Sequence, residues 1–100
     1  MPGTGQQAVL LFKIVTLRDE IVIGLSPAQL AALGGSDVGT VGQALSRDGA
    51  LTAWQYAVRR RDEGTLEQAP LRQISILGHD SIRVEPYSTP LPIRPIPERA

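Results

Sequence analysis

The sequence contains no cysteine, and this absence excludes several kinds of chemistry at once. A chain without thiols forms no disulfide, carries no cysteine nucleophile and holds no zinc–thiolate centre. Its single histidine, His79, is too few for a histidine-based metal site. We therefore expect no metal and no cofactor, and a cytoplasmic location, because disulfides are typical of oxidising compartments.

An excess of positive charge is also missing, because ten lysines and arginines balance ten aspartates and glutamates. Nucleic acids and anionic lipids attract proteins with surplus positive charge. No segment approaches the roughly 20 apolar residues that a membrane span needs. The first seven residues, MPGTGQQ, carry neither the basic region nor the apolar stretch of a signal peptide. We expect neither nucleic acid nor a membrane as a partner.

The bulk composition is that of one small globular domain. The chain has 100 residues, of which 42% are apolar and 20% are charged, and this is enough for one modest core. We divide it into a flexible lead (1–7), a single domain (8–87) and a proline-rich extended arm (88–100).

Short segments rich in β-branched and aromatic residues predict an α+β fold with about five antiparallel strands. In the first predicted hairpin, Leu17 faces Ile21. Short connections favour a meander for the last three strands, with Ile76 opposite Ile82, and a curl of the sheet would bring it towards a small barrel. The strands are expected near residues 8–17, 20–25, 51–61, 71–77 and 81–87.

One or two short helices are expected between the second and third strands. The first is clearly marked, with Ser26 as N-cap, Pro27 at the first helical position and Gln29 completing a capping box. Gly34 supplies its left-handed cap.

The segment 36–47 is open to interpretation as helix, strand or loop. Three apolar residues have helical spacing, but two interior glycines each cost about 1 kcal/mol in a helix relative to alanine. We favour a short helix over 40–47, with Thr40 and Gln43 as a second capping box. The three apolar residues are Val38, Val41 and Leu45.

His79 has two interpretations. Its neighbours Gly78 and Asp80 tolerate turn geometry, which predicts a three-residue hairpin turn with an exposed histidine. A His79–Asp80 general-base pair would instead make the protein a small enzyme. Adjacent turn residues rarely point at each other, and no third group completes a catalytic set. We favour the turn, and we expect the protein not to be an enzyme.

The run RRRDE is the densest group of charges. Strand alternation places Arg59 and Arg61 on one side and Arg60 on the other. The paired arginines would suit an anion. The alternative is a solvated strand end, in which the arginines form ion pairs with carboxylates. The candidate carboxylates are Glu67, Glu85 and Asp80.

Trp54 and Tyr56 are two residues apart and therefore share a strand face. Exposed aromatics of this kind stack on ligands, whereas buried ones fill a core. We favour a core position for Trp54 against Ile74 and Ile76. The ligand-binding candidates of the whole chain are Trp54, Tyr56, Arg59, Arg61 and His79.

The arm carries four prolines, which exclude a helix or an inner strand and favour an extended conformation. Its apolar residues are not needed in a purely solvated tail, so we expect it to lie across another subunit. The residues expected to make this contact are Leu91, Pro92, Ile93, Pro95 and Ile96.

These features predict a small non-catalytic interaction or accessory protein. Its partner is expected to be a second copy, forming a homodimer, or a larger protein, bound through the arm or through an exposed strand edge. The alternative is a small-ligand binding module with a pocket between the sheet and the short helices, lined by Trp54 or Tyr56.

Overall fold

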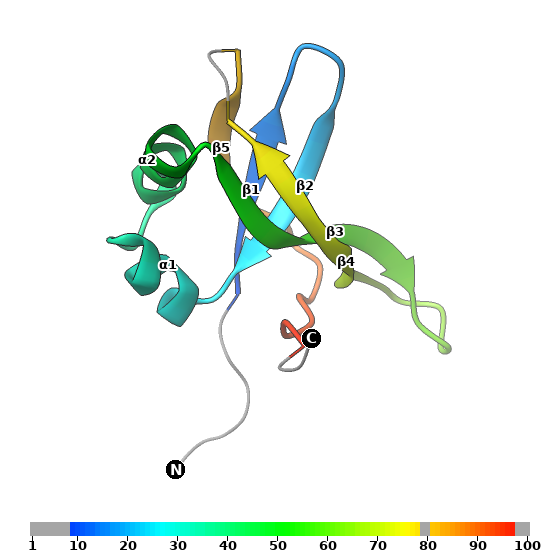
Figure 1. Ribbon diagram of the computed structural model, residues 1–100. Coiled ribbons are helices and arrows are strands. Elements are labelled where there is room, and N and C mark those ends of the chain that lie inside the picture. The colour runs from blue at the N-terminus through cyan, green and yellow to red at the C-terminus, as the bar shows by residue number, and fades with distance from the viewer. Residues whose placement is uncertain (1–8, 79–80, 98–100) are drawn as a thin grey trace.

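The computed structural model describes residues 9–78 and 81–97. Five strands and two helices follow one another along the chain (Figure 1). In chain order they are β1 (Leu10–Val15), β2 (Glu20–Leu25), α1 (Pro27–Leu33), α2 (Val38–Asp48), β3 (Ala50–Arg60), β4 (Leu66–Leu77) and β5 (Arg83–Tyr87). Among the described residues, none of the helices has the length and apolar character to cross a membrane.

The five strands form one antiparallel sheet in the order β4-β3-β2-β1-β5, which confirms the α+β prediction. The first four strands are a meander, and β5 joins at the opposite edge. The expected meander of the last three strands is therefore wrong in its final step, because Val84 pairs with Ile14 and not with Ile74. In the part of the chain that the structure describes, the two edge strands do not pair, so the sheet stays open.

The β1–β2 hairpin turns earlier than expected, and its register is shifted by three residues. Thr16 accepts hydrogen bonds from the backbone N–H groups of Arg18 and Asp19, and its own N–H donates to the Asp19 carbonyl. Leu17 therefore stands exposed at the tip, and Ile14 takes its expected place opposite Ile21. A shift by an odd number of residues exchanges the two faces of a strand, so the even-numbered residues Phe12 and Ile14 of β1 point into the core.

Both helices begin with a capping box. Ser26 and Gln29 exchange hydrogen bonds at the start of α1, as predicted, and Gly34 closes this helix with φ at 112°. The segment 36–47 is mostly helical, but α2 begins at Val38 because Asp37 is its N-cap. Thr40 is the third residue of this helix and bonds back to Asp37, so the predicted capping box of Thr40 with Gln43 is wrong.

Both helices cover the same face of the sheet and enclose the core with it (Figure 1). The predicted position of Trp54 is wrong. It pairs with Gln73 on the other face, while Ala53 lies opposite Ile74 in the core. The error has a simple cause, since β3 carries apolar residues on both faces and alternation alone does not say which one is buried. The core consists of Phe12, Ile14, Ile23, Leu25, Leu30, Val41, Leu45, Leu51, Ala53 and Ile76.

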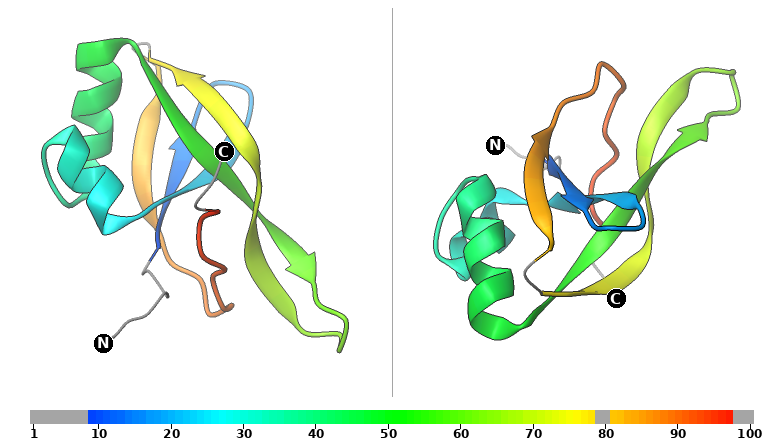
Figure 2. Two further views of the ribbon diagram at one scale, coloured as in Figure 1. Left: turned by 60° about the horizontal axis from the view of Figure 1, so that its bottom comes forward. Right: turned by 90° about the horizontal axis from the view of Figure 1, so that it is seen from above.

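The proline-rich segment 88–97 folds back along its own chain, on the side of the sheet away from the helices (Figure 2). It pairs with β4 as a single parallel bridge between Ile93 and Gln68. The Gln68 N–H donates to the Pro92 carbonyl, and the Arg94 N–H donates to the Gln68 carbonyl, each at 2.8 Å. The segment therefore occupies the edge of β4 near Gln68.

Candidate functional site

The β3–β4 hairpin extends beyond the rest of the sheet (Figure 1). It carries a buried carboxylate among arginines. Glu67 on β4 lies directly opposite Arg59 on β3, and 1% of the Glu67 surface is exposed. Arg59 donates two hydrogen bonds to Glu67 Oε2, from Nε at 3.1 Å and from Nη2 at 2.6 Å. Charge-assisted hydrogen bonds of this kind are stronger than those between neutral groups.

Two further arginines approach the other oxygen of the same carboxylate. Glu67 Oε1 lies 3.7 Å from Nε of Arg61 and 4.0 Å from Nε of Arg94. These distances suit ion pairs but exceed those of hydrogen bonds, and Oε1 is buried without a hydrogen-bond partner among the described residues. We call Arg59, Arg61, Arg94 and Glu67 the arginine cluster.

The cluster keeps its carboxylate ionised. The hydrogen bonds from Arg59 lower the pKa of Glu67 below its ordinary value, and the charges of Arg59, Arg94 and Arg61 add to this, while partial desolvation opposes it. The three guanidinium groups are half-exposed and cover the carboxylate at the protein surface. The cluster borders a cavity of about 380 Å³ lined by four arginines and three carboxylates.

Arg59 and Arg61 were predicted to share one side of β3, and both contact Glu67. Arg60 donates to the Gly64 carbonyl at 3.3 Å and lines the same cavity without an ion pair to Glu67 among the described residues. Of the three carboxylates considered as partners, Glu67 is contacted by these arginines, Glu85 pairs with Arg83, and Asp80 lies outside the described residues. The sequence analysis missed Arg94, whose one signal was a charged residue between the prolines of the arm.

Tyr56 ties the arm to the sheet beside this cluster. Its hydroxyl donates to the Arg94 carbonyl at 2.7 Å, and 2% of the residue is exposed. Burial raises the pKa of Tyr56 to about 12, so the phenol remains a donor at physiological pH. Trp54 shares this face of β3 but is half-buried opposite Gln73 and does not reach the arginines.

The predicted arm residues contact their own chain. Pro92 and Ile93 form the bridge to β4, and Leu91 and Ile96 are partly buried, while Pro95 is exposed. His79 and Asp80 lie outside the described residues, so the turn predicted there is not described either. Within 9–78 and 81–97, no three histidine, aspartate or glutamate side chains come together as metal ligands.

No protein-family model, curated protein or solved structure matches this chain.

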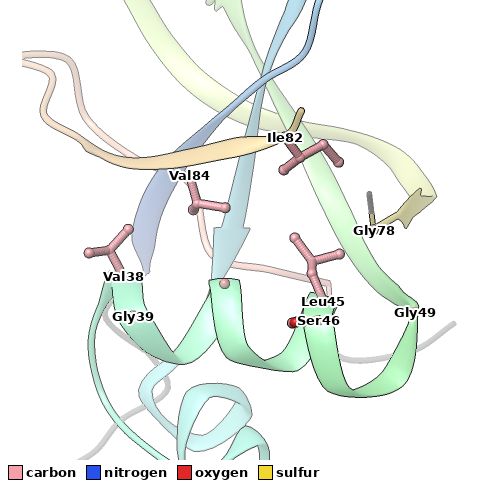
Figure 3. A pocket seen from close by; sticks show the side chains of 9 residues that line it. Val38, Gly39, Leu45, Ser46, Gly49, Gly78, Ile82 and Val84 are labelled. Carbon is pink, nitrogen blue, oxygen red and sulfur yellow. The ribbon is translucent and has the colours of Figure 1, made fainter. Parts of the chain in front are cut away.

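A second cavity, of about 530 Å³, lies between α2 and β5 (Figure 3). Val38 and Leu45 of α2 and Ile82 and Val84 beside them point into this space. Gly42 opens it further, because a Cβ atom at this position would meet nothing within 4 Å. The cavity lies between the sheet and a helix, as the alternative function predicted, but Trp54 and Tyr56 do not line it.

Strand β4 is the longest of the five strands and lies at an edge of the sheet. It has 12 residues, and the arm pairs with it at Gln68 alone in the described part of the chain. Beyond the arm, no strand formed by residues 9–78 or 81–97 pairs with residues 71–77 on this side. Leu71 and Leu77 are 55% and 67% exposed.

Proposed function

We propose that this is a non-catalytic, cytoplasmic interaction protein that forms a homodimer through the free edge of β4. The observation that carries this proposal is the unpaired edge of residues 71–77 with an exposed leucine at each end. Natural proteins protect long edge strands with lysine, proline or covering segments, because unpaired backbone groups recruit another strand. Pro70 and a β-bulge at Leu71, where β4 shifts register against β3, protect one end of this edge. Within residues 72–77 the one charged residue is Arg72.

The sequence of this edge is self-complementary in an antiparallel pairing. A two-fold axis at Ile74 places Leu71 of one copy opposite Leu77 of the other, twice in the dimer. The same register puts Arg72 opposite Ile76, so no two like charges face each other. Pairing would therefore cover both exposed leucines and satisfy the backbone groups of the edge.

The opposite edge of the sheet is less suited to this role. Strand β5 has five residues and includes Pro86, which lacks a backbone N–H. Its exposed Arg83 is ion-paired to Glu85, and α2 packs beside the strand. Short, charged and proline-containing strands are the usual protected edges.

The arm limits the interface at one end. By pairing with β4 at Gln68, it leaves only the half of the edge beyond Pro70 for a second copy. In this proposal, the arm pairs within its own chain and takes no direct part in the contact between the two copies.

The test is the mass in solution of Leu77→Lys, measured by light scattering. In the proposed register Leu77 lies at each end of the contact, opposite Leu71 of the other copy. A charge there opposes pairing, so the wild type should have the mass of a dimer and the variant that of a monomer. Val58→Lys is the matched control, because Val58 is also exposed, at 55%, but lies on the inner strand β3. A monomeric wild type, or a dimer that survives Leu77→Lys, would contradict the proposal.

The second candidate function is binding of a small apolar molecule in the cavity between α2 and β5. The open space at Gly42 favours it. An apolar fluorescent probe should bind the wild type, and Gly42→Leu should abolish binding by filling the cavity. Ala32→Leu on the exposed side of α1 is the control. Equal probe binding by both variants would remove this candidate.

A further inference from the structure

The arginine cluster contains one acceptor without a donor. An ionised carboxylate accepts several hydrogen bonds, yet those of Glu67 all reach Oε2, and Oε1 is buried without one in the described residues. Leaving a buried acceptor unsatisfied is costly, and more so when it is charged. Arg61 and Arg94 stand at ion-pair distance from Oε1 and do not remove this cost.

The same cluster has more donors than it uses. Each guanidinium carries five N–H groups, and Arg59 spends two of its own on Glu67. Arg61 Nε also lies 3.4 Å from Glu63 Oε2, which lines the same cavity. The side chains of Arg61 and Arg94 are 42% and 51% exposed, so their remaining N–H groups are accessible from the cavity. Guanidinium groups are the preferred partners of planar and tetrahedral oxyanions.

A ligand that fits both features must offer anionic oxygens to the arginines and one hydrogen to Glu67. Inorganic phosphate has both, since it retains at least one P–OH group at neutral pH, and a protonated phosphate monoester has both as well. Sulfate has the same shape but carries no hydrogen at this pH. It would place an acceptor against the buried carboxylate.

We infer that the arginine cluster binds a phosphate group, whose P–OH donates to Glu67 Oε1 while its other oxygens accept from Arg61 and Arg94. The cavity of about 380 Å³ is lined by Glu67 and has room for such a group. Because Oε1 is itself buried, the inference requires the half-exposed side chains of Arg61 and Arg94 to move apart as the phosphate enters. Because Arg61 lies on the β3–β4 hairpin and Arg94 on the arm, bound phosphate links the two segments. This inference does not rest on the proposed dimer, whose edge is the other half of β4.

The experiment is calorimetric titration of the protein with sodium phosphate and with sodium sulfate at equal ionic strength. One hydrogen bond to a charged group corresponds to about tenfold or more in affinity, so phosphate should bind at least about tenfold more tightly than sulfate. Glu67→Gln supplies an amide donor, so sulfate should bind it as well as phosphate does. Equal binding of the two ions by the wild type, or binding of neither, would overturn the inference.

Two charge variants keep the test decisive if Glu67→Gln does not fold. Arg61→Gln should weaken phosphate binding about tenfold, because it removes one charged donor. Arg83→Gln changes the net charge equally but lies on β5 and should leave binding unchanged. An equal loss of phosphate affinity in both variants would show that phosphate is attracted by overall charge and not bound at the cluster, which would contradict the inference. Phenyl phosphate has mostly lost its P–OH at neutral pH, because the second pKa of a phosphate monoester is about 6, so it should bind more weakly than inorganic phosphate. Tighter binding of phenyl phosphate at neutral pH would contradict the hydrogen bond from P–OH to Glu67 Oε1.

Discussion

Substitution by alanine should change the free energy of unfolding in opposite directions at two glycines. A Cβ atom at Gly24 would overlap the ring of Tyr56 and lie 3.0 Å from Val9 Cγ1. Gly24→Ala should therefore lower the free energy of unfolding by about 1–3 kcal/mol, the usual cost of overpacking. Gly42 lies within α2 with open space around it. Gly42→Ala should therefore raise the free energy of unfolding by about 0.5–1 kcal/mol. Urea unfolding measures both, and changes of equal sign would contradict this explanation.

Glu67 makes the stability of the folded chain depend on pH in the acid range. Its pKa is lower in the folded chain than in the unfolded chain, whose glutamates titrate near about 4.3. The unfolded state therefore binds more protons in this range, and stability rises with pH. The contribution is complete above the unfolded pKa and is lost as pH falls through the folded one.

Thermal melts at a series of pH values check this prediction. The wild type should be more stable than Glu67→Gln at neutral pH, and the difference should shrink as pH falls below about 4. Glu63→Gln is the matched control. It also removes one carboxylate from the lining of this cavity, but the Glu63 side chain is 57% exposed. A difference that stays constant down to acid pH would show that Glu67 is not held ionised by its arginines.

The sequence predicted three of the four residues of the arginine cluster. Alternation along β3 was sufficient to place Arg59 and Arg61 on one side, and Glu67 was among their expected partners. It was not sufficient to predict Arg94, because the arm reaches the hairpin only through the tertiary fold. The unpaired Oε1 of Glu67 depends on the same packing.

At the scale of elements, the local signals of α1 were reliable, whereas the start of α2 and the strand pairing were not. The capping box of α1 rests on residues three apart and was correct. The hairpin of β1 and β2 was misaligned because β1 is apolar on both faces, with both Leu11 and Phe12 buried, so alternation gave no preference for a register. The partner of β5 depends on the core, where Val84 packs beside Ile14.

The arm is the element whose removal is most informative. A chain truncated after Tyr87 loses two backbone hydrogen bonds to Gln68 and the acceptor of the Tyr56 hydroxyl. At about 0.5–1.5 kcal/mol each, this should lower the free energy of unfolding by about 2–4 kcal/mol. Because the proposed dimer uses the other half of the β4 edge, the mass should remain that of a dimer.

Thermal unfolding and light scattering of the truncated chain test both statements. Tyr56→Phe is the partial control, because it removes one of the three hydrogen bonds and retains the arm. An unchanged melting temperature would show that the arm does not stabilise its own sheet. If the truncated chain were a monomer, the dimer contact would be made by the arm and not by the β4 edge, as the sequence analysis expected.

The whole molecule is an open sheet with unequal edges. Helix α2 packs beside β5, and the arm covers β4 only at Gln68. The chain is electrically neutral overall, so charge repulsion does not hold two copies apart. Contact through backbone groups and leucines is therefore expected to change little with salt, whereas phosphate binding should weaken as salt screens the arginines.

Dimerisation should make the thermal stability depend on protein concentration. When unfolding is coupled to dissociation, mass action favours the folded dimer at high concentration. For a chain of this size, the melting temperature should rise by about 3–5 °C for each tenfold increase in concentration. Leu77→Lys should melt at one temperature at all concentrations, and Val58→Lys should behave as the wild type. Scanning calorimetry of the three proteins measures this, and a wild type with a constant melting temperature would mean that the folded state is a monomer with its β4 edge exposed.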